Sequence, residues 1–64
     1  MAISMKAARV NAGLTQIEVA EKVGKTKGTI ASYEAYATTP DIMTAQVLAE
    51  LYGMSINDIK WTKG

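Results

Sequence analysis

Apolar residues recur at helical spacing in successive short stretches of this chain, and typical helix starts and stops separate the stretches. A glycine follows the first, second and fourth stretches, and glycine commonly ends a helix because it enters the left-handed conformation at low cost. The pattern predicts an all-α fold without strands, in a single domain over residues 1–64. The five predicted helices cover about 4–11, 16–23, 27–35 and 42–52, with a last short helix that begins at Ser55.

One stretch, residues 15–35, has the signals of two helices joined by a tight turn. Thr15 and Glu18 have the spacing of a capping box, in which each side chain accepts from the other residue's backbone N–H at a helix start. Gly24 then predicts the end of this helix, and Thr26 can cap the next one. Two helices joined by a glycine turn within about twenty residues form the helix-turn-helix arrangement, whose second helix lies in the major groove of DNA.

The helix predicted over residues 42–52 has two apolar stripes rather than one. The stripe expected to face the core consists of Ile42, Ala45, Leu48, Ala49 and Tyr52. A domain this small can cover only one face of a helix, so we expect the second stripe to stay outside. A tryptophan follows near it in sequence, on a tail too short to fold over the tryptophan. Exposed apolar patches mark contacts with partners. The sequence therefore predicts a homodimer with an interface formed by Met43, Val47, Leu51 and Trp61.

Composition narrows the classes of function. The 64 residues include no cysteine and no histidine, so disulfides, thiolate metal sites and the commonest general base are all missing. We therefore expect no catalytic residue, no enzyme activity, no metal or other cofactor, and no small-molecule substrate. No apolar run approaches the length of a membrane span and no signal-peptide pattern opens the chain, so we expect a cytoplasmic protein without a membrane partner.

The net charge of +1 hides an uneven distribution of charged residues. Residues 1–27 carry five basic and two acidic residues, residues 28–59 carry four acidic residues and no base, and Lys60 and Lys63 follow at the end. A positive first part is suited to DNA phosphates, although a mixed solvated surface explains the charges equally well. Charge therefore supports a DNA partner only in combination with the helix-turn-helix pattern.

Several short motifs follow one another along nearly the whole chain. They are Arg9-Val-Asn-Ala-Gly-Leu-Thr-Gln16, Val19-Ala20, Gly24-Lys-Thr-Lys-Gly-Thr-Ile30, Tyr33-Glu34, Pro40, Gly53 and Ser55-Ile-Asn-Asp58. Each motif alone is weak, but their order and spacing resemble the Cro/phage-repressor type of helix-turn-helix domain, the lambda-repressor-like family. The resemblance implies a compact phage or bacterial regulator of transcription, such as a repressor, that binds double-stranded DNA.

The resemblance also implies roles for individual residues. It places Gln16 at a phosphate, and it places Arg9 beside Glu34 as a structural ion pair rather than as an exposed cation. Lys27 is the main candidate for base readout because a lysine at this position can donate to guanine, while the other side chains on this helix face are short. The residues expected at DNA are Gln16, Lys25, Thr26, Lys27, Gly28, Thr29, Ser32, Tyr36 and Thr38.

Two departures from the family pattern favour an alternative function. Many members have glycine at the position of Tyr36 and carry lysine or arginine in the loop that follows, whereas residues 36–39 contain no cation. Fewer cations at phosphates mean weaker DNA binding. The alternative is a protein-interaction module on the same scaffold, such as an antitoxin or an anti-repressor. DNA binding is the favoured hypothesis because the helix-turn-helix motif places Gln16 and Lys27 towards the groove.

Overall fold

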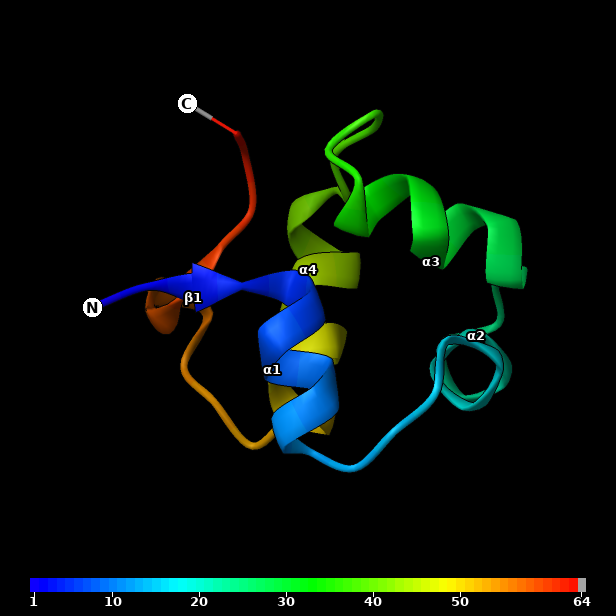
Figure 1. The fold of residues 1–64 in the computed structure, drawn as a ribbon, viewed down its shortest axis with the longest axis horizontal. Coiled ribbons are helices and arrows are strands. Elements are labelled where there is room, and N and C mark those ends of the chain that lie inside the picture. Colours follow the sequence, from blue (N-terminus) through cyan, green and yellow to red (C-terminus); the bar gives the residue numbers. More distant parts are fainter. Residues whose placement is uncertain (64) are drawn as a thin grey trace.

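The computed structural model describes residues 1–63, and in this range it has four α-helices, one 3-10 turn and one pair of very short strands. In Figure 1, α1 lies in front of α4, α3 lies at the upper right, α2 is seen nearly end-on below it, and β1 lies at the left. In chain order the elements are β1 (Ile3–Ser4), α1 (Met5–Asn11), α2 (Gln16–Val23), α3 (Lys27–Glu34), α4 (Ile42–Leu51), the 3-10 turn η1 (Ile56–Asp58) and β2 (Ile59–Lys60).

Each of the four α-helices begins with a side chain that accepts a hydrogen bond from the backbone N–H three residues on. These caps are Ser4, Thr15, Thr26 and Asp41. The capping box of α2 is complete, because Glu18 Oε1 also accepts from the Thr15 N–H at 2.9 Å, and this bond lowers the pKa of Glu18. The caps satisfy N–H groups that have no partner inside a helix, and they confirm the predicted helix starts.

One core joins all four helices and β2. Within α4, the inward stripe begins at Ala45, which is 3% exposed. The prediction that Ile42 extends this stripe is wrong, because its side chain is 66% exposed. Side chains on a helix lean towards its N-terminus, so the first residue of α4 points past the edge of the core, next to the buried Pro40. The residues of the core cluster are Met5, Ala8, Val19, Ala20, Ile30, Tyr33, Leu48, Ala49, Tyr52 and Ile59.

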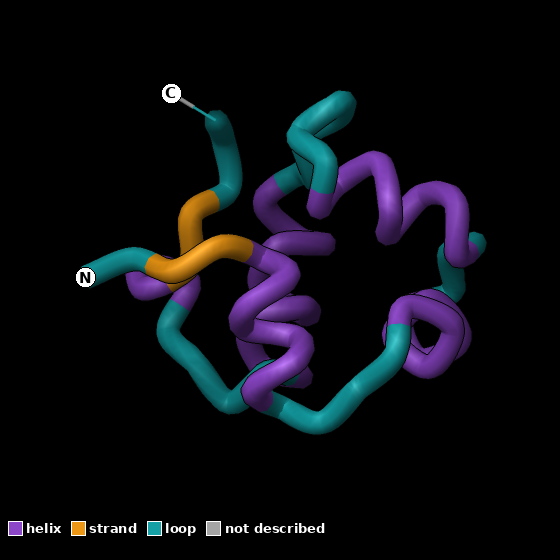
Figure 2. Tube along the Cα trace, viewed as in Figure 1, coloured by secondary structure: helices purple, strands orange, loops and turns teal. Residues whose placement is uncertain are grey.

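The prediction of a fold without strands is wrong at the two ends of the chain. β1 and β2 pair in parallel, with Ile3 opposite Ile59 and Ser4 opposite Lys60 (Figure 2). Ile59 is 3% exposed and Ile3 packs against the same core, so apolar burial holds the pair together. Strands of two residues are too short to produce an alternating pattern, which is why the sequence does not predict them.

The segment after α4 also differs from the prediction. It forms the single 3-10 turn η1, capped by Ser55, and enters β2 directly after Asp58, so it is not a fifth α-helix. Trp61 does not stay free of the domain on its short tail, because its ring packs against the core and is partly buried. Its indole N–H donates to the Ile56 carbonyl at 2.8 Å, which satisfies the polar group of a partly buried tryptophan.

Candidate nucleic-acid interface

The turn between α2 and α3 is closed by short-range hydrogen bonds. Gly24 follows α2 with φ of +71°, in the left-handed region that favours glycine. The N–H of Lys25 donates back to the Ala20 carbonyl at 2.9 Å and so closes the last turn of α2. Thr26 then caps α3, which packs against α2. The helix-turn-helix unit expected from the sequence is therefore present.

α3 has one buried face and one open face. Ile30 is 1% exposed and Tyr33 is 8% exposed, so both side chains belong to the core. Lys27 and Gly28 lie exposed in the first turn. The structure therefore gathers most of the candidate DNA contacts at the turn and on the open face of α3. These exposed or partly exposed residues are Lys25, Thr26, Lys27, Gly28, Thr29 and Ser32.

Two of these candidates, Thr26 and Thr29, bond each other. Their hydroxyl oxygens lie 3.0 Å apart, and the Thr29 N–H also donates to Thr26 Oγ1 at 3.2 Å. Only one of the two hydroxyl protons is used between them, so the other hydroxyl can still donate outward, for example to a phosphate oxygen. The pair thus holds the start of α3 rigid and keeps one donor available.

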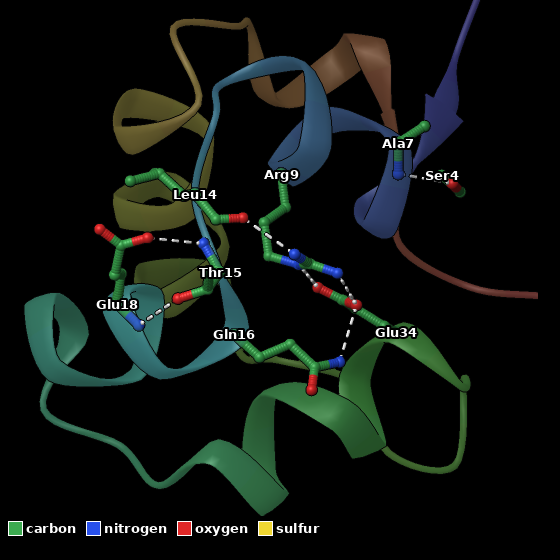
Figure 3. A network of polar contacts seen from close by, with 8 residues as sticks. All are labelled: Ser4, Ala7, Arg9, Leu14, Thr15, Gln16, Glu18 and Glu34. Carbon is green, nitrogen blue, oxygen red and sulfur yellow. Dashed lines mark hydrogen bonds and ion pairs between the residues drawn. The ribbon is translucent and has the colours of Figure 1, made fainter.

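A polar network ties α1, the start of α2 and the end of α3 together (Figure 3). Arg9 Nε donates to Glu34 Oε2 at 2.6 Å, and Arg9 Nη2 donates to Glu34 Oε1 at 3.1 Å. Arg9 Nη1 donates to the Leu14 carbonyl at 2.9 Å, just before α2. Gln16 Nε2 donates to Glu34 Oε1 at 3.0 Å. The network therefore fixes the first turn of α2 relative to α3.

The Arg9–Glu34 ion pair is largely buried, with side chains 11% and 6% exposed. The hydrogen bond that Arg9 donates to Glu34 raises the pKa of Arg9 above its ordinary value, against the opposing effect of burial. The resemblance implies this pair but not the bond from Gln16 to Glu34, since it assigns Gln16 to a phosphate. That bond uses one of the two amide N–H donors of Gln16, so the second N–H can still reach a phosphate.

The loop after α3 holds the last two candidates. Tyr36 has φ of +60°, and it is the one residue other than glycine with positive φ among residues 1–63. Its hydroxyl donates to the Lys60 carbonyl at 3.1 Å, so this side chain already has a partner within the protein. Thr38 is exposed, and its N–H donates to the Ser32 carbonyl at 3.4 Å. The loop therefore lies against the end of α3 and against β2.

The model of a protein family described as Helix-turn-helix matches residues 5–59, which is most of the chain. The chain belongs to the Cro/C1-type helix-turn-helix family. Comparison with curated proteins and with solved structures gives no match. Membership of the family supports a DNA-binding regulator.

The outer side of α4 is the main apolar surface outside this helix-turn-helix unit. Met43 and Val47 are 74% and 47% exposed, whereas Leu51 and Trp61 are partly buried against the core. The structure thus leaves two of the four expected interface residues well exposed. A shallow groove between α2 and α4 continues this surface, and it is lined by Lys22, Val23, Val47, Glu50 and Leu51.

Residues 1–63 have neither a candidate metal cluster nor a candidate membrane span. No three residues with potential metal-binding side chains (His, Cys, Asp or Glu) form a cluster there. No helix in this range is long and apolar enough to cross a membrane.

Proposed function

We propose that this protein is a sequence-specific transcriptional regulator of the Cro/repressor type, which places α3 in the major groove of double-stranded DNA. The observation that carries the proposal is the start of α3, where Lys25, Lys27 and Gly28 are exposed on a capped turn supported by the core. In this role the protein is not an enzyme, uses no cofactor or small-molecule substrate, and acts in the cytoplasm of a bacterium or of a phage-infected cell.

The proposed contacts follow from the position and chemistry of each residue. Lys27 donates to guanine O6 or N7, or to a phosphate. Gly28 permits close approach of the backbone to the bases because it has no side chain. The space beside it is open, since a Cβ built at this position would have only Thr26 Oγ1 within 4 Å, at 3.8 Å. Thr29 contacts a thymine methyl or a phosphate. The remaining candidates contact phosphates through side chains or backbone N–H groups, and they are Gln16, Lys25, Thr26, Ser32 and Thr38. Tyr36 is not among them, because its hydroxyl and its N–H already donate to the carbonyls of Lys60 and Tyr33.

We further propose that the protein binds DNA as a homodimer through the outer side of α4. Met43 and Val47 stand one helical turn apart and supply the exposed apolar surface. Two-fold symmetry would place two copies of α3 about 34 Å apart, one turn of DNA, and would double the number of cations at the phosphates. Leu51 and Trp61 would contribute only their exposed parts, at the edge of the interface.

A second candidate function is a protein-interaction module on the same scaffold, such as an antitoxin or an anti-repressor. The groove between α2 and α4 favours it, because the groove combines apolar side chains with Lys22 and Glu50 at its sides. The loop over residues 36–39, which contains no cation, also suits a protein that depends little on phosphate contacts.

The affinity of the protein for random duplex DNA at two salt concentrations separates the two functions. A regulator that contacts several phosphates loses affinity steeply as salt rises, by about 0.9 in log K per log unit of salt for each phosphate contact. We expect this slope for the parent protein. Absence of binding even at low salt would instead favour the protein-interaction module.

The dimer is tested by sedimentation of Met43→Glu/Val47→Glu, which puts two charges on the exposed side of α4. We expect a folded monomer with weaker binding to a two-fold operator. Val10→Glu is the matched control, because Val10 is 56% exposed but lies on α1. A parent protein that sediments as a monomer at concentrations well above those needed for binding contradicts the dimer.

A further inference from the structure

The C-terminal segment is held beside the loop that follows α3. β2 pairs with β1, and the Tyr36 hydroxyl donates to the Lys60 carbonyl at 3.1 Å. The next residue, Trp61, is fixed by its bond to the Ile56 carbonyl. Three separate contacts therefore anchor residues 59–61, and the bond from Tyr36 joins this segment to the loop over residues 36–39. In Figure 1 the chain after β2 rises towards the same upper edge of the molecule as this loop and α3.

The backbone of Tyr36 indicates that its side chain is needed at this position. With φ of +60° it adopts a conformation that glycine would adopt at lower cost. Glycine, however, could neither pack on the core nor bond the Lys60 carbonyl, and Tyr36 does both. The side chain thus offsets its unfavourable backbone conformation with contacts that attach the C-terminal segment to the loop.

The same segment carries the positive charge that the loop lacks. Ile59 points into the core and is 3% exposed, and its neighbour Lys60 is exposed, as expected from the alternation of side chains along a strand. Lys63 is exposed as well. Residues 28–59 contain no basic residue, so these two lysines are the first cations in the chain after Lys27.

We infer that Lys60 and Lys63 form a second phosphate-binding site for the DNA backbone, beside the loop over residues 36–39, and that Tyr36 is the positioning residue that holds them there. This inference rests on the proposed DNA-binding function. The two lysines take the place of loop cations. Because phosphates look alike, the site adds affinity without adding base specificity.

The test compares Lys60→Gln/Lys63→Gln with the parent protein in titrations of a duplex at several salt concentrations. Each lost phosphate contact should lower the salt slope by about 0.9, so the double variant should lose about 1.8. Between 50 and 200 mM salt, its affinity should therefore fall about tenfold less than that of the parent. Lys22→Gln is the matched control, because it removes the same charge from the groove between α2 and α4, and it should leave the slope unchanged.

Tyr36→Phe then tests the positioning role, since it removes only the hydroxyl that bonds Lys60. We expect it to weaken DNA binding in the parent by up to about eightfold at 0.1 M salt, the share of one phosphate contact with a slope of about 0.9, and to have no effect in Lys60→Gln/Lys63→Gln. An equal loss in both backgrounds would show that the hydroxyl acts on the fold and would overturn the positioning role. An unchanged salt slope in the double variant would overturn the phosphate site while leaving the proposed function intact. A parent protein that does not bind duplex DNA would overturn both the phosphate site and the proposed function.

Discussion

Removing Arg9 should destabilise the protein far more than removing an ordinary surface cation. Glu34 is 6% exposed, and in Arg9→Met it would lose both bonds from the guanidinium. Loss of one partner from a buried ion pair costs about 3–5 kcal/mol. Gln16 still donates to Glu34 Oε1, so we expect a loss near the lower end, about 3 kcal/mol. A domain of 64 residues has a free energy of unfolding of about 3–10 kcal/mol, so this single change removes a large part of it.

Urea denaturation followed by circular dichroism measures this loss directly. Arg9→Met/Glu34→Gln is the matched second variant, because it leaves no unpaired charge beside the core. We expect the double variant to be more stable than Arg9→Met alone, whereas Glu34→Gln alone should be less stable than the parent, and this non-additivity marks a coupled buried pair. A loss of less than about 1 kcal/mol in Arg9→Met, as measured for exposed ion pairs, would refute this reasoning.

Two further changes separate stability from function. Gly28→Ala should raise the free energy of unfolding by about 0.5–1 kcal/mol, because alanine favours the helix and its Cβ would meet only Thr26 Oγ1 at 3.8 Å. The same variant should bind DNA more weakly in titrations, and stronger binding would place Gly28 away from the bases. Burial raises the pKa of Tyr52 to about 12, so the folded state favours the neutral hydroxyl over the phenolate. The stability that this preference contributes is complete below about pH 10 and is lost as pH rises towards 12. In urea titrations between these pH values, stability should fall less steeply in Tyr52→Phe than in the parent, and equal slopes would contradict this assignment.

The helix-turn-helix unit can be predicted from the sequence because its signals are local. Thr15, Glu18, Gly24 and Thr26 act within a few positions of their partners, and each forms the cap or turn that its spacing indicates. The stripe of α4 from Ala45 onward is predicted for the same reason, since one helix face must be buried. The expectation for Ile42 fails because periodicity does not show where the core ends.

The remaining features depend on contacts between distant parts of the chain. The pairing of Ile3 with Ile59 and the bond from Tyr36 to Lys60 each join segments that no local pattern links. The same holds for the bond from Gln16 to Glu34. The resemblance to the family supplies the Arg9–Glu34 pair, but the attachment of the C-terminal segment to the loop after α3 is apparent only from the three-dimensional arrangement.

Selection of bound sequences from a random pool of duplex DNA, with the parent and with Lys27→Ala, tests the central claim most directly. The parent should enrich one sequence and bind it more tightly than random duplex at the same salt concentration. Lys27→Ala should bind that sequence about 1–3 kcal/mol more weakly and lose its preference at one guanine. If the parent enriches no sequence, or if Lys27→Ala binds the enriched sequence as tightly as the parent does, α3 does not read DNA as proposed.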